Sequence, residues 1–218
     1  RNIDGSIMGD IKVNEIKTDA ITNKAGTSVM TVDASGYLTA SQPVLAKLRL
    51  TSNQTNLSDE SYNKLKLDEA AIDTKSGFDN SNDLYVIPVA GYYRIYVQAH
   101  IGVISEQNSL RDSALIITNT QASDDTEVQI ATSHHRHYVN PGDTSDVTEN
   151  IYTIHQFATG DKIAVYTYGN TDTGTAYDVF ADIDASDETH MNTGLPGTGG
   201  GEDNSTFVII ERIIWQVK

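Results

Sequence analysis

The sequence predicts an all-β protein, built as a sandwich, a barrel or a jelly roll, and three observations support this fold class. Apolar and polar side chains alternate over several segments, and a period of two indicates a strand with one buried face. Clusters of Gly, Asn, Asp and Ser separate these segments, as turns do. No stretch carries an apolar stripe at i, i+3, i+4 and i+7 over three turns, so we expect almost no helix.

Residues 1–42 differ from the rest of the chain, because they hold only short apolar pairs separated by turn residues. One copy of such a segment cannot bury enough surface to offset the entropy of ordering it. It either stays flexible or wraps around identical copies in an intertwined β-stalk, and we favour the stalk. Pro43 marks the boundary, so residues 43–218 are predicted to form the head domain.

The head contains a series of segments that read as strands. They are residues 44–52, 63–67, 84–104, 114–117, 126–139, 150–158, 162–169, 176–183 and 206–217. The last of them is apolar on both faces, which is typical of a central strand that is covered on both sides.

The stretch Leu84–Ile104 has the clearest alternation, and the rest of the head is predicted to pack around it. From Tyr93 onward one face is apolar, and Pro88 and Gly91 suit its entrance. A strand with one dry face requires a second sheet to cover that face. The other face carries Tyr92 and Tyr96, which either contact another subunit or are ordinary surface aromatics.

Composition excludes several classes of partner. The chain has 218 residues, 30 of them acidic and 15 basic, so its net charge is −15. This charge repels nucleic acid and anionic membranes. The chain has no cysteine, which excludes disulfides and cysteine-bound zinc. No apolar run approaches the roughly 20 residues of a membrane helix, so we expect no membrane insertion.

Four segments, in order along the chain, resemble one known family. They are SNQTNLSDESYNKLKLD with IDTKSGFD, then VIPVAGYYRIYVQ, then FATGDKIAVYT, then NSTFVIIERI. They resemble the TNF-like jelly roll shared with the globular heads of complement component 1q, in the form found on bacteriophage fibres. The chain has no collagen-like stalk. GDIKVNEIKTDAIT and VDASGYLTA instead resemble sequences that precede receptor-binding heads in phage fibres.

This resemblance implies a jelly-roll β-sandwich head with a short N-terminal β-stalk, assembled as a threefold homotrimer. The sheets would then pack around the threefold axis. The trimer interface is expected at the tyrosine face of the longest strand and on the last strand, with Tyr92, Tyr96, Ile210 and Trp215 as its residues.

Two clusters are candidate metal sites, although no cofactor is required. His135 and His137 share one face of a strand, and threefold symmetry could present their six nitrogens to one transition metal at the trimer axis. A solvated or receptor-facing strand end and a pH-sensitive interface remain alternatives for them. Asp182, Asp184 and Asp187 open a long loop, and calcium is bound by six to eight oxygens from such loops. Acidic runs also occur simply as solvated surface.

No enzymatic function is predicted. The sequence lacks G-x-S-x-G, H-E-x-x-H, a P-loop and a dinucleotide fingerprint. A polysaccharide-cleaving spike would also need paired carboxylates in a groove.

We therefore expect a virion protein, assembled in the host cytoplasm, whose trimeric head binds a host-surface glycan or protein. The N-terminus is expected to join other virion proteins. Candidate contacts are the loops 184–203, 138–146 and 105–112, with Tyr138, Tyr177, His190 and Asn192 as contact residues. Two alternatives are a capsid decoration protein that binds the virion lattice, and a secreted lectin-like or cytokine-like trimer.

Overall fold

The computed structural model describes residues 20–22, 28–32, 38–40, 44–103, 110–137, 147–181 and 206–213. The chain divides into two compact units, Arg1–Gln42 and Pro43–Lys218. In the first unit β1 (Ala20–Thr22), β2 (Ser28–Val32) and β3 (Leu38–Ala40) pair in an antiparallel sheet. That this unit acts as a stalk stays a prediction.

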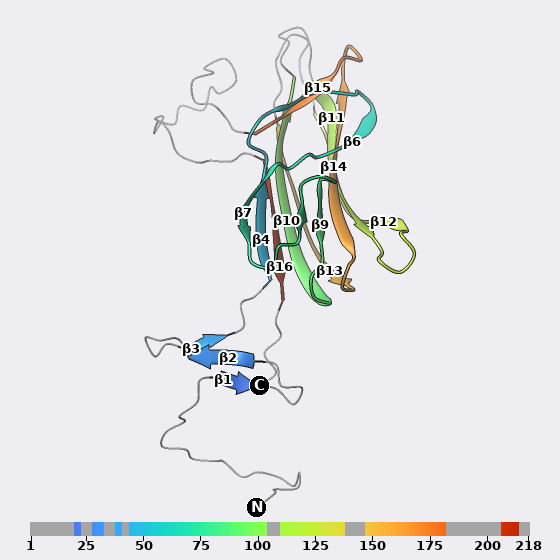
Figure 1. The fold of residues 1–218 in the computed structure, drawn as a ribbon. Helices are drawn as coiled ribbons and strands as arrows, with labels where there is room; N and C mark the ends of the chain where they lie inside the picture. Colours follow the sequence, from blue (N-terminus) through green and yellow to red (C-terminus); the bar gives the residue numbers. More distant parts are fainter. Residues whose placement is uncertain are drawn as a thin grey trace, which may run out of the picture. The chain divides into compact units, whose positions relative to one another are not determined.

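The second unit consists of two antiparallel sheets (Figure 1). The first, called the β10 sheet, has the order β5-β15-β10-β16-β4-β7, and β13 also pairs with β10. Its strands are β4 (Leu45–Arg49), β5 (Gln54–Leu57), β7 (Glu69–Asp73), β10 (Gly91–Gly102), β13 (Val147–Phe157), β15 (Tyr177–Phe180) and β16 (Phe207–Arg212).

The second sheet, called the β14 sheet, has the order β12-β11-β14-β9-β8, and β6 pairs with β14. Its strands are β6 (Ser61–Lys64), β8 (Phe78–Asp79), β9 (Leu84–Val86), β11 (Leu110–Thr120), β12 (Glu127–Arg136) and β14 (Lys162–Thr171). The described residues contain no helix, and the predicted all-β class is confirmed.

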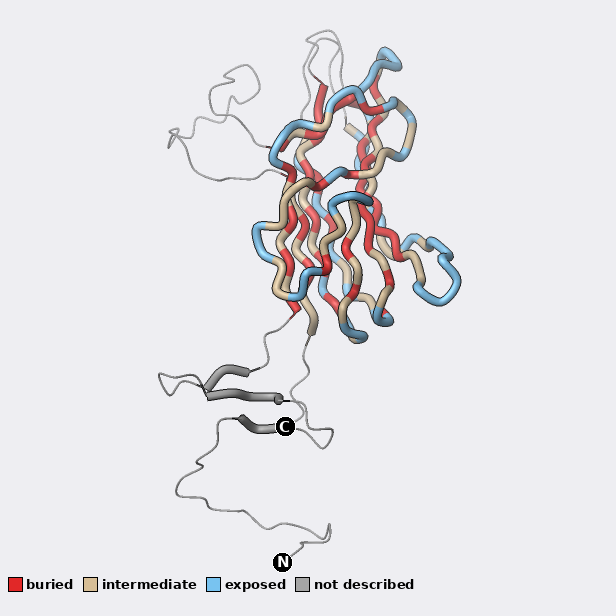
Figure 2. The backbone as a smooth tube through the Cα atoms, viewed as in Figure 1, coloured by how far each residue is buried: buried red, intermediate tan, exposed pale blue. Residues whose placement is uncertain are grey.

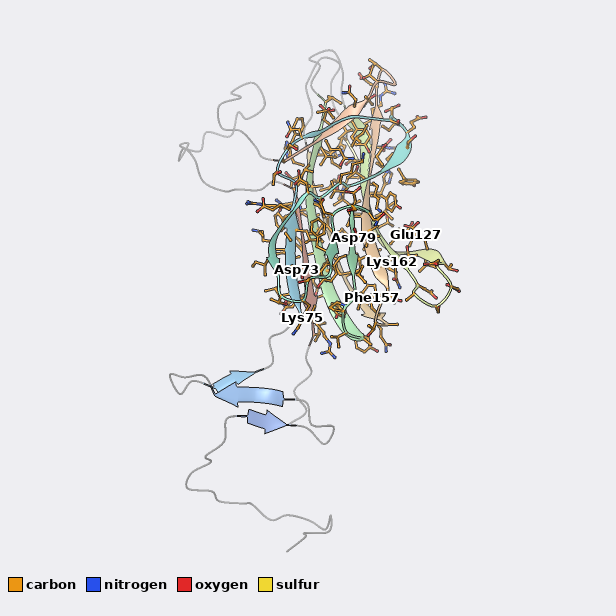
Figure 3. All side chains as sticks on the ribbon, in the orientation of Figure 1. Asp73, Lys75, Asp79, Glu127, Phe157 and Lys162 are labelled. Carbon is orange, nitrogen blue, oxygen red and sulfur yellow. The ribbon has the colours of Figure 1, made fainter. Side chains whose placement is uncertain are left out.

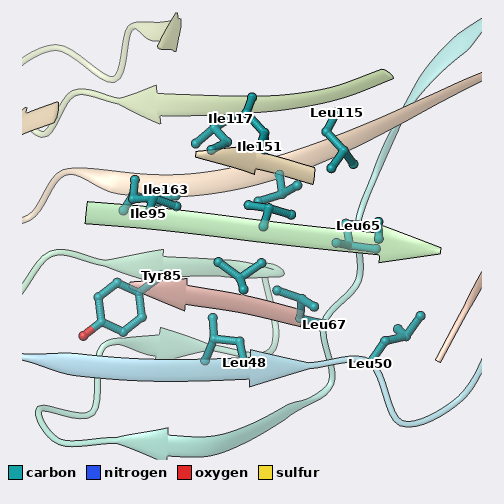
Figure 4. Close-up of a cluster of buried hydrophobic side chains, with 14 of the residues drawn as sticks. Leu48, Leu50, Leu65, Leu67, Tyr85, Ile95, Leu115, Ile117, Ile151 and Ile163 are labelled. Atoms are coloured by element: carbon teal, nitrogen blue, oxygen red, sulfur yellow. The ribbon is translucent and has the colours of Figure 1, made fainter. Parts of the chain in front are cut away.

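The hydrophobic core lies between the two sheets and is centred on β10. Every second residue of this strand is fully buried, namely Tyr93, Ile95, Val97, Ala99 and Ile101. Figure 2 shows this alternation along the strand. In the same cluster are Leu115, Ile117 and Ile163 of the opposing sheet (Figure 4). The predicted dry face and the covering sheet are therefore both present.

Some sequence predictions are corrected by the pairing. β5, β7 and β8 lie in segments that we expected to be turns or a polar connection, and Leu110–Asp112 belongs to β11 rather than to a loop. These strands are short and partly exposed, so they show little hydrophobic alternation. The stretch from Leu84 also divides, since β9 joins the β14 sheet before the chain crosses to begin β10 at Gly91.

The last strand, β16, buries one face rather than two. Val208 and Ile210 lie opposite Val97 and Ile95 of β10, and Ile210 is only 1% exposed. Ile210 was predicted to lie at the trimer interface. That prediction is wrong, because the strand's alternation turns Ile210 into the core of its own subunit. Ile209, on the other face, is partly exposed.

Asp161 ties two turns together at one end of the sandwich. It follows Gly160, whose φ of 89° lies in the region that favours glycine, in the turn between β13 and β14. The buried carboxylate accepts hydrogen bonds from the backbone N–H groups of Ala122 and Ala158, each at 2.9 Å. It thereby holds the β11–β12 turn against the β13–β14 turn.

Tyr177 is fully buried, so its predicted role as an exposed receptor contact is wrong. Its ring fills the space above Gly169, where a Cβ atom would lie 2.7 Å from the ring. Its hydroxyl accepts a hydrogen bond from Nδ2 of Asn63 at 3.0 Å and lies 3.1 Å from Oγ1 of Thr167. Tyr85 is equally buried, but its hydroxyl has no hydrogen-bond partner. Burial raises the pKa of Tyr85.

These two buried tyrosines should respond in opposite ways to loss of the hydroxyl. Tyr85→Phe removes an unpaired polar group from the core, so the free energy of unfolding should stay unchanged or rise by about 1 kcal/mol. Tyr177→Phe removes the hydroxyl that Asn63 and Thr167 contact, and it should lower the free energy of unfolding by about 1–2 kcal/mol. Urea denaturation followed by tryptophan fluorescence measures both. Equal losses in the two variants would contradict this assignment.

Candidate functional site

Several predicted site residues lie outside the described residues. They are Tyr138, Asp182, Asp184, Asp187, His190, Asn192 and Trp215. The calcium site and the contact loops 184–203 and 138–146 therefore stay predictions.

The outer face of the β10 sheet is the first candidate surface. In register, Tyr96 of β10 lies between Tyr152 of β13 and Ile209 of β16, and Arg94 lies between Ile154 and Glu211. Directly opposed residues of antiparallel strands point to the same face. The outer face is defined as Leu45, Lys47 and Arg49 of β4, Glu69 and Ile72 of β7, Tyr92, Arg94, Tyr96 and Gln98 of β10, Asn150, Tyr152, Ile154 and Gln156 of β13, and Phe207, Ile209 and Glu211 of β16.

Much of this outer face is apolar and accessible. Tyr152 is 56% and Ile154 50% exposed, and the side chains of Ile72 and Tyr92 are 42% and 45% exposed. Tyr96 packs against Phe207 with ring centroids 5.7 Å apart. Scattered apolar residues are ordinary on a surface, but a contiguous group of aromatic and aliphatic side chains is typical of an interaction surface.

Four of the five charged residues on the outer face form two ion pairs. Arg94 donates to the Glu211 carboxylate, and Arg49 donates to both oxygens of Glu69 at 2.8 and 2.9 Å. Lys47 lies over the Phe207 ring, 5.3 Å from its centroid. Because these charges already have partners, covering the face would leave few of them uncompensated.

His135 and His137 come together on a buried carboxylate. Glu149 of β13 is 1% exposed, and its Oε2 lies 2.5 Å from Nδ1 of His135. Ser113 of β11 donates its hydroxyl to Oε1 of Glu149 and lies 2.7 Å from Nε2 of His137. Since β13 belongs to one sheet and β11 and β12 to the other, this cluster ties the sheets together along one edge.

The Glu149 cluster gives no sign of a metal centre. Within the part of the chain that the structure describes, no group of three or more His, Cys, Asp or Glu is arranged to hold a metal ion. His134 and Arg136 point away from Glu149 and approach Asp112, at 3.7 and 3.2 Å. A metal on the trimer axis stays a prediction.

The Glu149 cluster also lacks the geometry of a catalytic triad. In a triad the acid holds the ring nitrogen that faces away from the nucleophile. Here the carboxylate lies 3.8 Å from Nε2 of His137, the same nitrogen that contacts Ser113. Ser113 is fully buried and donates to the carboxylate. The cluster is therefore a polar crosslink between the sheets.

The crosslink should make folding stability depend on pH through His137. Burial lowers the pKa of His137 below its ordinary value of 6.5, with the nearby charge of Glu149 acting in the opposite direction. The unfolded chain then binds the proton first, so stability is present above about pH 6.5 and is lost as the pH falls toward the lowered value. We expect urea midpoints of the wild type to fall more steeply between pH 7 and 5 than those of His137→Gln.

His134→Gln, on the opposite face of β12, is the matched control and should keep most of the wild-type pH dependence, because the charge of His134 is the smallest of the effects on His137. Identical pH profiles for the wild type and His137→Gln would contradict the expectation.

Comparison with known proteins defines the fold. No protein-family model matches the sequence, and no curated protein sequence matches it. Eiger TNF from S. frugiperda superposes with a TM-score of 0.53 at 11% identity, over 82% of this chain and 97% of that one. Murine APRIL at pH 5.0 gives 0.50 at 9% identity, over 79% of this chain and 100% of that one.

The globular domain of zebrafish complement 1qA gives a TM-score of 0.47 at 11% identity, over 81% of this chain and 100% of that one. At 11% and 9% identity, the superpositions on Eiger TNF and APRIL show the fold alone. The predicted resemblance is confirmed at that level, and its phage-fibre form stays a prediction. The second unit has a TNF-like jelly-roll fold.

Proposed function

We propose that this protein is a non-enzymatic binding module that assembles as a homotrimer, and that it is the receptor-binding end of a phage fibre. Self-association is supported by the outer face of the β10 sheet, which has contiguous, partly exposed aromatic and aliphatic side chains. In this proposal residues 1–42 form the β-stalk and connect the head to other virion proteins.

A second copy of this chain is the partner that the outer face fits best. Two identical copies with a net charge of −15 repel one another over most of their surface. The outer face is an exception, because its three basic residues, Lys47, Arg49 and Arg94, outnumber its two acidic ones, Glu69 and Glu211. Repulsion between copies is therefore weakest where the apolar side chains gather. Three copies follow from the resemblance of the sequence to TNF-like heads.

A trimer of this kind binds its target through multivalency. Three weak sites on one particle act together, so the combined affinity exceeds that of one site without any new contact. The proposed target is a glycan or protein on the host surface, and the acidic chain disfavours nucleic acid. Across the described residues, no helix has the length and hydrophobicity needed to cross a bilayer. The proposed location is the virion, after assembly in the host cytoplasm.

The structural similarity to Eiger TNF favours one second candidate. In that alternative the same trimer is a secreted, cytokine-like or lectin-like module, and the outer face has the same role.

Self-association is tested by placing a charge in the outer face. The wild type should have a mass of three times 23.7 kDa, about 71 kDa, by native mass spectrometry and light scattering. Tyr152→Glu should shift the mass toward the single subunit, because it buries an unpaired carboxylate in the interface. Tyr62→Glu is the matched control, since Tyr62 is 65% exposed on the opposite side of the sandwich. A wild type of 23.7 kDa would refute the proposal.

Target recognition is tested with the chain of 218 residues and intact cells. Labelled protein is incubated with a panel of bacterial strains and a panel of animal cells. Binding to a bacterial strain, together with protection of that strain from a phage, supports the fibre. Binding to animal cells alone supports the secreted module. Absence of binding to every cell type overturns both.

A further inference from the structure

The outer face of the β14 sheet carries three tyrosines, Tyr62 of β6 and Tyr166 and Tyr168 of β14, which we call the tyrosine row. In register, Tyr168 lies opposite Tyr62, and Tyr166 comes two positions earlier on the same strand. Residues with this spacing and pairing point to the same face of a sheet. Tyr62 is 65% exposed, and Tyr166 and Tyr168 are half-buried. The tyrosine row is therefore accessible to a ligand.

The accessible apolar surface at the tyrosine row is aromatic. The rings of Tyr62 and Tyr168 pack with centroids 5.4 Å apart and a tilt of 45°. The aliphatic residues beside the row, Ala114 and Ile116 of β11, lie opposite Tyr168 and Tyr166 and are only 5% and 7% exposed. A ligand at this face would meet ring faces rather than aliphatic chains.

This composition differs from that of the outer face of the β10 sheet. There the tyrosines are accompanied by exposed aliphatic side chains, those of Ile72 and Ile154. Aliphatic chains have several rotamers and can fit the irregular side chains of another subunit. Rigid rings without accessible aliphatic neighbours instead match a ligand that itself has a flat apolar face.

The charged side chains on the outer face of the β14 sheet already have partners. Glu127, labelled in Figure 3, accepts a hydrogen bond from the hydroxyl of Tyr166 at 3.0 Å. Lys64, which lies opposite Tyr166, donates to a backbone carbonyl. Arg136 and Asp112 face each other at 3.2 Å. Because these charges are compensated within the chain, the tyrosine row favours a neutral ligand.

Neutral polar groups flank the tyrosine row on both sides. Thr132 of β12 lies across β11 from Tyr166, and Asn170 comes two positions after Tyr168. Flat rings bordered by hydroxyl and amide groups fit a molecule with one apolar C–H face and a rim of hydroxyl groups. A neutral pyranose sugar has this chemistry.

We propose that the tyrosine row binds neutral pyranose units of a surface glycan, with the C–H face of a sugar stacked on Tyr62 and Tyr168. The inference rests on the proposed function and names its receptor class. The outer face of the β10 sheet is the proposed contact between copies, so the tyrosine row, on the other sheet, stays accessible in a trimer. Three rows on one trimer would bind a glycan surface multivalently.

Saturation-transfer NMR of the chain of 218 residues tests the tyrosine row with maltose, lactose, mannobiose and chitobiose, and with sialic acid as the anionic comparison. At least one neutral sugar should bind with a Kd on the order of millimolar, and sialic acid should bind more weakly. Tyr62→Ala removes a ring and should weaken this binding about fivefold. Tyr62→Phe keeps the ring and should retain most of it.

Val89→Ala is the matched control, because it removes an exposed apolar side chain from the turn between β9 and β10. It should bind sugar as the wild type does. The proposal is overturned if no neutral sugar binds, if sialic acid binds more tightly, if Tyr62→Ala binds like the wild type, or if Tyr62→Phe loses as much as Tyr62→Ala.

The same preparations are tested for mass and for cell binding, which separates this inference from the proposed function. A wild-type trimer that binds cells but no sugar removes the tyrosine row as a glycan site and leaves the receptor-binding head. A wild type that binds sugar through Tyr62 but binds no cell removes the receptor-binding head and leaves the glycan site.

Discussion

The burial of one face of β10 is the constraint on which the rest of the head depends. Five consecutive inward side chains, from Tyr93 to Ile101, are fully buried, so a second sheet must lie over the whole length of the strand. β10 also pairs with β13 along one edge and with β16 and β15 along the other. Its inner face thus organises the core, and its outer face is the centre of the proposed subunit interface.

Two polar crosslinks complement this hydrophobic core. Each centres on a buried carboxylate whose hydrogen bonds a hydrophobic residue could not replace. Glu149 joins β13 to β11 and β12 of the other sheet, through Ser113 and His135. Asp161 joins two turns at one end. Buried carboxylates are stable only when their oxygens receive hydrogen bonds, so both groups define the relative positions of the elements that supply the donors.

The sheet faces divide the proposed roles among different parts of the head. The inner faces supply stability, the outer face of the β10 sheet is the proposed contact between copies, and the tyrosine row and the loops and turns at the ends are the proposed ligand contacts. Turns are suited to that role because they tolerate changes in sequence that the paired strands do not. A jelly roll can therefore keep one architecture while its targets differ, and function must be argued from the site rather than from the fold.

The all-β class, the dry face of β10 and the turn at Asp161 could be predicted from sequence, because each depends on local spacing: alternation along one strand, or a Gly-Asp pair between two apolar segments. The motifs that resemble TNF-like heads also lie along the chain in order. Local pattern does not reveal which neighbour covers a residue. That is why Ile210 and Tyr177 were placed on the surface, although the packing of β16 and β15 buries them.

Only the tertiary structure shows which residues meet at Glu149 and at Asp161. His135 and His137 are conspicuous in the sequence, but the carboxylate that they share comes from Glu149, on a strand of the other sheet. Asn119 and Asp161 are separated along the chain by β12 and β13, which belong to different sheets, and they meet only because two turns lie side by side. Such contacts depend on the pairing of strands that are distant in sequence. The alternation of apolar and polar residues along one segment does not identify the strand with which that segment pairs.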